Sequence, residues 1–463
     1  MSYNNASDNT PKRSSFSGKL GFVLSAAGAS VGLGNIWRFP YLAAKYGGGI
    51  FLLVYIILAL TFGYTMIIAE TAIGRMTQKS PVGAYTHFGS KAWMKIGGWI
   101  NAVIPILIVP YYSVIGGWVM KYLWEYIRGN AKFLAQDEMF SGFIASGKSP
   151  EAWFLIFSMA TLVIIFMGVQ SGIERVSRFM MPILVVLALI VCIYSMTRPG
   201  AGAGIAYFLI PDPSRFSWMT VVAAMGQMFY SLSIAMGILV TFGSYMKKDV
   251  AIEGSTRQVE FFDTMIAVMA GLMIIPAVFA FHGADAGEAL QAGPSLMFIT
   301  MPKIFNSMGF GNVIGAVFFL LVLFAALTSS IALAESAVST FEDQFHWSRH
   351  KVMIIIGIVM ITLGSLSALG YGPLASVKII GMQFLDFFDF ITNSVMMPIA
   401  AFATCILVVF VIGREKIAAE VEREGNTFHR KKIFNFMVKW LCPIFVLIIL
   451  ASSVASAFGW IKM

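Results

Sequence analysis

Long apolar runs alternate with short polar segments along almost the whole chain. Runs long enough to cross a bilayer, which takes about 20 residues, lie near residues 19–44, 48–74, 96–127, 151–169, 177–197, 217–246, 258–281, 311–341, 350–369, 381–412 and 434–461. The pattern predicts an all-α polytopic membrane protein with eleven transmembrane helices. Several runs exceed 25 residues, so we expect some helices to be tilted or to extend beyond the bilayer.

The composition supports this class of protein. Of 463 residues, 58% are hydrophobic and 12% are charged, whereas soluble globular chains carry about 25% charged residues. Such a chain lacks the charge needed to cover a soluble surface, and it is too apolar to be intrinsically disordered. The net charge of +9 comes from Lys and Arg placed between apolar runs, so we expect no nucleic-acid partner.

The distribution of Lys and Arg orients the predicted helices. With the N-terminus in the cytoplasm, inner segments carry 20 Lys and Arg residues and outer segments carry 8. Cytoplasmic loops of membrane proteins carry such an excess. We therefore expect a cytoplasmic N-terminal segment at 1–18, an extracellular loop at 198–216 and a cytoplasmic loop at 413–433. The C-terminus would then lie on the extracytoplasmic side.

Two of the apolar runs are interrupted at corresponding positions. The first contains Gly28, Gly32 and Gly34 close to Asn35, which makes a poor helix interior. A matching weak stretch lies at 227–237 in the sixth run. Close helix packing through small residues is one explanation; paired broken helices around a transporter's binding site are the other. The second predicts five-helix repeats at 19–197 and 217–412, with an eleventh helix appended in 434–463.

Short motifs along the chain resemble those of the neurotransmitter:sodium symporters. They are GASVGLGNIWRFP at 28–40, the glycines at 47–49, Glu70 with residues 74–75, and residues 111–112, 226–227, 327–330 and 341–343. The resemblance covers essentially the whole chain in the right order, and eleven helices are similar to the bacterial amino-acid branch. It implies a 5+5 inverted repeat with broken helices 1 and 6, and sodium-coupled transport.

The resemblance implies two sodium sites. The first (Na2) would use backbone carbonyls and hydroxyls of Gly28, Val31, Ala325, Thr328 and Ser329. The second (Na1) would use the Ser30 carbonyl with the side chains of Asn35, Ser231 and Asp263. As an alternative, the hydroxyls of residues 328 and 329 would bond back to the preceding helical turn.

Asp263 departs from the family pattern, because Asn is usual at this position. A carboxylate at membrane depth is costly unless it meets a cation. We therefore expect Asp263 to supply a fixed negative charge to Na1, and transport to need no chloride.

The resemblance also implies a substrate site between the two breaks. Its residues would be Ala29, Ser30, Gly32, Leu33, Gly34, Ile108, Tyr112, Tyr230, Ser231, Ser233, Ala235, Met236, Ser329 and Leu333. Monoamine-transporting members have Asp in place of Gly32, where it substitutes for the missing substrate carboxylate. Glycine here implies a free α-amino acid. The uncharged side-chain pocket, with the adaptable Met236, predicts a neutral hydrophobic L-amino acid, aromatic ones included; plain core packing is the alternative for Met236.

Two gates follow from the same resemblance. The outer gate would contain Arg38, Asp389 and Gln227, with Tyr112 and Tyr230 as an aromatic lid. The inner gate would contain Arg13, Asp343, Tyr245 and Phe16, the last at a position where the family usually has Trp.

Two further carboxylates lie within apolar runs. We expect Glu70 to accept hydrogen bonds from broken-helix amides. For Glu335, protonation and a role in a proton path both remain open.

The function expected from these features is sodium-coupled import of an amino acid by alternating access, with two Na⁺ ions, across a bacterial inner membrane. A membrane sensor that binds without transport and a proton-coupled transporter are the alternatives. An enzyme is not expected, because the sequence lacks a metal-ligating or Ser-His pattern and its five histidines lie at run edges or in loops. The oligomeric state is left open.

Overall fold

The protein is described by a computed structural model that places residues 14–283, 286 and 296–457. Within these ranges the chain folds into helices and contains no strand. The helices of the first predicted repeat are α1 (Lys19–Ser30), η1 (Gly34–Arg38), α2 (Phe39–Lys45), α3 (Gly49–Leu58), η2 (Ala59–Gly63), α4 (Tyr64–Thr77), α5 (Pro81–Thr86), α6 (Ala92–Ile127), α7 (Ala131–Leu134), α8 (Met139–Ala145), α9 (Lys148–Phe166), η3 (Val169–Glu174) and α10 (Arg175–Met196).

The rest of the chain is built in the same way. Its helices are α11 (Ala201–Leu209), η4 (Pro213–Arg215), α12 (Trp218–Ser231), α13 (Ile238–Ser244), α14 (Ile252–His282), η6 (Leu296–Thr300), α16 (Met301–Ser307), α17 (Gly311–Phe345), α18 (Arg349–Leu369), α19 (Phe384–Asp389), η7 (Phe390–Met396), α20 (Met397–Ile406), η8 (Leu407–Ile412), α21 (Arg414–Val421), η9 (Arg423–Gly425), α22 (Lys431–Phe436), η10 (Met437–Leu441) and α23 (Cys442–Ala457).

The described residues contain 9 helical segments long and apolar enough to cross a membrane, and 10 when the bent pair Lys19–Ser30 and Gly34–Lys45 is taken as one span. The run at 217–246 is split between α12 and α13, each of which is too short to cross alone. The all-helical membrane fold is therefore confirmed. The count of eleven spans stays a prediction.

Some helix boundaries differ from those expected. The predicted runs at 151–169 and 177–197 leave residues 170–176 as a connection. In the structure the helical segment of the fifth span already begins at Val169, after Gly168 with φ +84°. The seventh span likewise begins at Ile252 and not near 258. Polar residues fill these first turns because they extend past the apolar layer, where hydropathy gives no signal.

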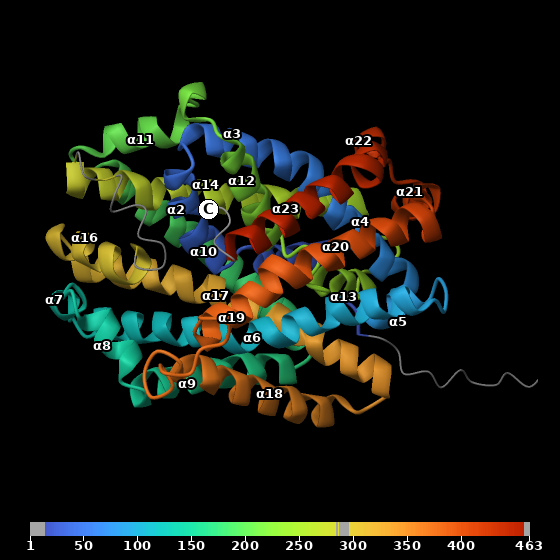
Figure 1. Cartoon of the computed structure of the whole chain (residues 1–463), viewed down its shortest axis with the longest axis horizontal. Coiled ribbons are helices and arrows are strands. Elements are labelled where there is room, and N and C mark those ends of the chain that lie inside the picture. The colour runs from blue at the N-terminus through green and yellow to red at the C-terminus, as the bar shows by residue number, and fades with distance from the viewer. Residues whose placement is uncertain (1–13, 284–285, 287–295, 458–463) are drawn as a thin grey trace, which may run out of the picture.

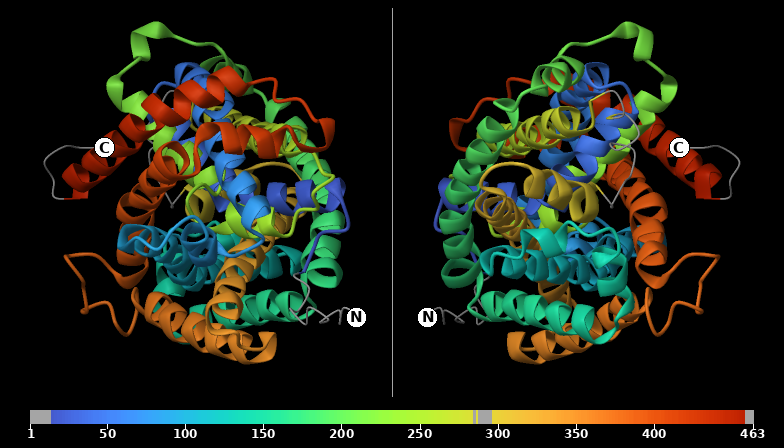
Figure 2. Two further views of the ribbon diagram at one scale, coloured as in Figure 1. Left: turned by 90° about the vertical axis from the view of Figure 1, so that its right-hand side faces the viewer. Right: turned by 90° about the vertical axis from the view of Figure 1, so that its left-hand side faces the viewer.

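The helices run roughly along the long axis of the molecule, and several short connecting helices lie toward its two ends (Figure 1). The connections predicted to be cytoplasmic, which contain α5, α21 and α22, lie together at the right-hand end. Those predicted to be extracellular, which contain α7, α8 and α16, lie at the left-hand end. In the end-on views α9 and α18 lie side by side on one outer face (Figure 2).

The first span is broken at its centre. Helix α1 ends at Ser30, Val31 is extended, and π-helical geometry begins at Gly34. The two parts are bent by 49°. Because α1 packs against α10, α14 and α17, the unwound backbone faces protein and not lipid, as a membrane requires of unpaired peptide groups.

The sixth span is broken over the six residues between α12 and α13. Three alternate residues there have left-handed backbone, with φ of 54° at Ser233, 59° at Ala235 and 70° at Gly237. A helix cannot pass through such residues, and side chains other than glycine adopt this conformation at a cost. Both predicted breaks are therefore present, and they lie in corresponding spans.

Candidate functional site

Oxygen atoms from the first break meet the eighth span. Ser329 Oγ on α17 lies 3.3 Å from the carbonyl oxygen of Gly28, 3.1 Å from that of Ala29 and 3.4 Å from that of Val31. Thr328 packs directly against Gly28. A set of neutral oxygen ligands of this kind suits a hard cation.

Thr328 and Ser329 behave differently. The Thr328 hydroxyl donates to the carbonyl oxygens of Phe324 and Ala325 in the preceding turn, at 3.0 and 3.1 Å. Ser329 instead reaches across to the unwound first span. The alternative considered above, in which both hydroxyls bond to the preceding helical turn, therefore holds for Thr328 only. The Ser329 hydroxyl connects the eighth span to the first.

A second polar group surrounds Asp263 on α14, which is fully buried. Its Oδ1 accepts from Asn35 Nδ2 at 2.7 Å and from Ser231 Oγ at 2.8 Å. Asn35 Oδ1 in turn accepts from the Gly32 amide at 3.2 Å. Three of the four predicted Na1 residues thus lie together, and the fourth, Ser30, lines the adjoining pocket. A carboxylate, a side-chain amide and a hydroxyl thus meet where the two broken helices contact α14.

Sequence reasoning missed Tyr55 of α3. Its hydroxyl lies 3.1 Å from Asp263 Oδ2 and 3.3 Å from Ser231 Oγ, and the side chain is buried. The available signal was a tyrosine in the middle of an otherwise apolar span, because a buried tyrosine hydroxyl needs a hydrogen-bond partner.

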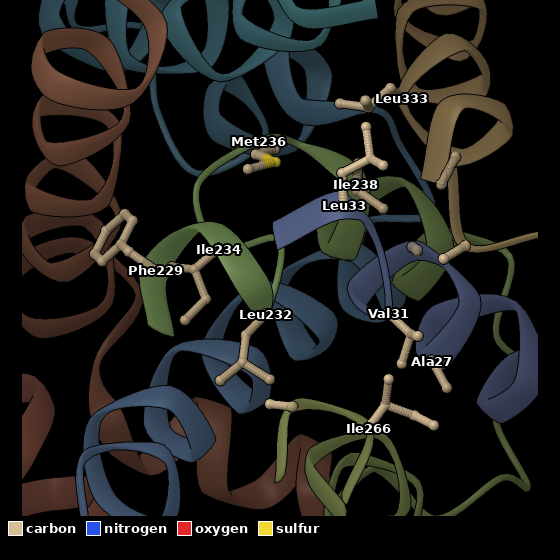
Figure 3. Packing of buried hydrophobic residues seen from close by; sticks show 14 of the residues in the cluster. Ala27, Val31, Leu33, Phe229, Leu232, Ile234, Met236, Ile238, Ile266 and Leu333 are labelled. Atoms are coloured by element: carbon tan, nitrogen blue, oxygen red, sulfur yellow. The ribbon is translucent and has the colours of Figure 1, made fainter. Parts of the chain in front are cut away.

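A pocket lies between the two breaks. It is lined by Ala29, Ser30, Gly32, Gly34, Ile108, Tyr112, Tyr230, Ser231, Ser233, Met236, Ile238, Ser329 and Leu333. Met236, Ile238 and Leu333 supply apolar side chains beside the breaks (Figure 3). Ile238, at the start of α13, was not expected. It follows the positive-φ Gly237, which ends the break and points the next residue inward.

Two residues predicted to line the substrate site, Leu33 and Ala235, are not among the residues that line the pocket. The amide of Leu33 donates to Tyr112 Oη at 3.0 Å, while the Leu33 side chain lines a different cavity. The amide of Ala235 donates to Glu70 Oε1 at 2.8 Å. That bond confirms the role expected for Glu70.

The central pocket is nearly closed. Its remaining volume is about 20 Å³, which suffices for little more than one water molecule. At Gly32, a Cβ atom would lie 2.6 Å from Ser329 Oγ and 2.8 Å from Tyr112 Oη. An amino acid therefore enters only if side chains such as Met236 move, and no side chain fits at position 32 in this arrangement.

Glu70 offers a test of how the sixth break is held. Glu70→Ala leaves the buried Ala235 amide without an acceptor, which costs about 1–3 kcal/mol. We expect a lower melting temperature for the purified protein, and a smaller loss for Glu70→Gln, which keeps an acceptor oxygen. Melting curves of the two variants beside the parent measure this. Equal stability of all three would show that the bond does not support the break.

A larger cavity of about 210 Å³ lies on the predicted outer side, and Arg38, Tyr111, Tyr230 and Asp389 are among the residues that line it. Asp389 accepts from Tyr111 Oη at 3.1 Å, and the Arg38 guanidinium lies 5.4 Å from the centre of the Tyr230 ring. No direct ion pair joins Arg38 to Asp389 among the described residues. The proposed outer gate is thus not closed by that pair here.

Tyr230 lines both this cavity and the central pocket, and Gln227, one helical turn earlier on α12, contacts the first span beside it. Gln227 Nε2 donates to the Gly34 carbonyl at 2.8 Å, and a Cβ atom on Gly34 would lie 2.6 Å from the Tyr230 ring. The sixth span therefore holds the first span tightly just above the pocket.

On the predicted inner side, Phe16 is buried against Phe22, Phe242 and Tyr245. Asp343 accepts from the Ser80 amide at 2.6 Å. Arg13 lies outside the described residues. Phe16 of the predicted inner gate is consequently packed in place, without the indole N–H donor of a tryptophan.

Glu335 has a partner that sequence reasoning did not propose. It pairs with Arg349 at the start of α18, where Arg349 Nη2 lies 2.5 Å from Glu335 Oε2, and Tyr245 Oη donates to its Oε1 at 2.9 Å. An arginine 14 residues further along was the available signal. With this cation present, the two interpretations considered for Glu335, protonation and a proton path, are not needed to explain a buried carboxylate.

An all-helical membrane fold, two broken helices and an oxygen-lined centre beside a small pocket define an integral membrane transporter. The chain belongs to the sodium:neurotransmitter symporter family, whose description matches residues 13–134 and 136–459. This match confirms the resemblance seen in the motifs. The family consists of transporters and not enzymes.

Individual relatives agree. A sodium-dependent transporter of Bacillus subtilis, YhdH, is 32% identical over 436 residues, which cover 93% of this chain and 95% of YhdH. The sodium- and chloride-dependent GABA transporter 2 of Homo sapiens is 27% identical over 78% of this chain and 69% of its own length. The crystal structure of MhsT in complex with L-phenylalanine has a TM-score of 0.86 and 37% identity, and covers 96% of this chain and 100% of MhsT.

Proposed function

We propose that the protein is a sodium-coupled symporter that imports a neutral hydrophobic L-amino acid by alternating access. The main support for the proposal is the arrangement at the two breaks. Asp263 with its partner Ser231, and Ser329 with the carbonyl oxygens of the first break, both adjoin one small, largely apolar pocket. Ions at these groups and an amino acid in the pocket would share neighbours, so binding of one would favour the other.

The substrate class rests on the pocket lining. Gly32 presents backbone and no side chain, which leaves the α-carboxylate of an amino acid free to approach the Leu33 and Gly34 amides and Tyr112. Ile108, Met236, Ile238 and Leu333 offer apolar contact for the side chain. A similar fold holds L-phenylalanine in MhsT, which favours aromatic substrates here.

The charge of Asp263 supports independence from chloride. With a fixed carboxylate beside Na1, a second anion is not needed to balance the bound sodium. The human GABA transporter is named for its chloride dependence. We propose that this chain differs because Asp263 is part of the site.

Gating and orientation complete the proposal. The Arg38 and Asp389 pair would close above the bound substrate, and Phe16 and Tyr245 would part below it. The N-terminus would be cytoplasmic, the repeats would span 19–197 and 217–412, and the membrane would be the bacterial inner membrane.

Uptake into proteoliposomes tests the proposal. With an inward Na⁺ gradient we expect concentrative uptake of one or more neutral hydrophobic amino acids, and Na⁺-dependent competition across the twenty amino acids would rank them. A sensor would give saturable binding without accumulation. A proton-driven transporter would respond to a pH gradient in the absence of Na⁺. Failure of a Na⁺ gradient to concentrate any amino acid contradicts the proposal.

A further inference from the structure

Three carboxylates share one buried face of α14. Glu253, Glu260 and Asp263 lie seven and three residues apart, a spacing that places them along one side of a helix. All three side chains are buried. The face runs from the predicted cytoplasmic end of the span to Asp263. Glu260 was not singled out from the sequence, although it lies inside the predicted run at 258–281.

Glu253 has hydrogen-bond donors around it. Its carboxylate accepts from Tyr64 Oη at 2.7 Å, from the His429 amide at 2.8 Å and from the Arg430 amide at 3.1 Å. The His429 ring also contacts this carboxylate, with Nδ1 3.1 Å from Oε2. The backbone and phenol donors stabilise the carboxylate without adding a full charge. Asp263 likewise has donors from Asn35, Ser231 and Tyr55.

Glu260 is paired with a cation instead. Arg430 Nη1 lies 3.4 Å from each of its carboxylate oxygens. The guanidinium is fixed from the other side as well, because its Nη1 also lies 3.4 Å from the Leu60 carbonyl and its Cζ lies 4.7 Å from the centre of the Tyr64 ring. Arg430 directly precedes α22, at the start of the helical segment that follows the two repeats.

Glu260 is also within electrostatic reach of Na1. Residues three apart on a helix have Cβ atoms about 5–6 Å apart, so the buried carboxylates of Glu260 and Asp263 are neighbours on α14. In a buried, weakly polarisable setting such charges act on each other far more strongly than in water. A negative charge at Glu260 therefore attracts a cation held at Asp263, and an uncompensated Arg430 repels it.

We propose that the Glu260–Arg430 ion pair is a positioning element that keeps the electrostatic potential at Na1 favourable to sodium, so that the segment just before the last helix affects sodium binding although it lies outside both repeats. The inference rests on the proposed function, since it requires that Asp263 hold Na⁺. Arg430 favours the charged form of the buried Glu260, and Glu260 in turn offsets an arginine charge that would otherwise repel the ion one helical turn away.

Purified full-length protein provides the test. Na⁺ is titrated at constant ionic strength with choline, and the half-saturating Na⁺ concentration is read from the rise in melting temperature and from ²²Na⁺ binding. Glu260→Gln removes the negative charge and leaves Arg430 unopposed, so we expect the half-saturating concentration to rise about three- to tenfold. Glu260→Gln with Arg430→Gln removes both charges and should recover most of that loss. Arg430→Lys keeps the charge and should bind Na⁺ as the parent does.

Matched controls separate charge from packing. Glu415→Gln and Lys416→Gln remove exposed charges of the same cytoplasmic region and should leave the half-saturating concentration unchanged. A purely structural role for the pair would lower the melting temperature in choline without moving the Na⁺ titration. A loss of Na⁺ affinity that does not depend on charge would instead leave the double variant as weak as Glu260→Gln. Either result overturns the inference.

Failure of the proposed function and failure of the ion-pair role give different results. If the parent protein shows no Na⁺-dependent stabilisation or binding at all, the proposed function is wrong. If the parent binds Na⁺ and Glu260→Gln binds it equally well, the proposed function stands and the role of the ion pair is wrong.

Discussion

Asp263→Asn is expected to reduce sodium-driven uptake about a hundredfold when chloride is absent. The carboxylate is fully buried and bonded to Asn35, Ser231 and Tyr55. Two opposite charges about 4 Å apart attract each other by about 4 kcal/mol at an effective dielectric constant of about 20. Part of this is offset because Asn keeps an oxygen ligand, which leaves a loss of about 2–3 kcal/mol, or about a hundredfold.

The role of the charge gives this variant a second expected property. Once the fixed carboxylate is gone, a chloride ion at the same place would balance the charge of the bound sodium. Chloride should therefore restore part of the uptake by Asp263→Asn and should not change uptake by the parent. Uptake in chloride and gluconate buffers measures both. Asp137→Asn, an exposed carboxylate paired with Lys303, is the control and should behave as the parent. Parent uptake that collapses without chloride contradicts the assignment.

Gly32→Ala is expected to lower substrate affinity about ten- to a hundredfold. The added methyl group would lie 2.6 Å from Ser329 Oγ and 2.8 Å from Tyr112 Oη. Overpacking at such distances costs about 1–3 kcal/mol, and here the displaced groups are the ones that line the pocket. Equilibrium binding of radiolabelled amino acid, at saturating Na⁺, measures the change.

A matched glycine separates the local effect from a general one. Gly202 lies in α11, where a Cβ atom would have no neighbouring atom within 4 Å, so Gly202→Ala should bind substrate as the parent does. Normal substrate affinity in Gly32→Ala would mean that the amino acid binds elsewhere than between the two breaks.

The fold and the centre of the site were predictable because each leaves a local trace. An apolar run indicates a span, and the glycines at 28, 32 and 34 weaken a helix wherever they stand. A carboxylate such as Asp263 is conspicuous in an apolar run because burying it alone is so unfavourable. These signals need no knowledge of which helices are neighbours.

Two of the missed contacts depend on neighbours distant in sequence. Tyr55 meets Asp263 across 208 positions, and Arg430 meets Glu260 across 170. Nothing in either local sequence specifies the partner, because packing of whole helices decides it. The closed state of the pocket is likewise a property of many side chains together, and so is the separation of Arg38 from Asp389.

Ser329 has one further consequence, for how the family diversifies. Its hydroxyl touches the carbonyl oxygens of the first break and also lines the pocket, so under the proposed function a substitution there would alter ion affinity and substrate choice together. Met236 and Ile238 line the pocket without taking part in either oxygen group. Changes of substrate specificity in evolution should therefore occur at positions such as 236 and 238, because substitutions there leave sodium coupling intact.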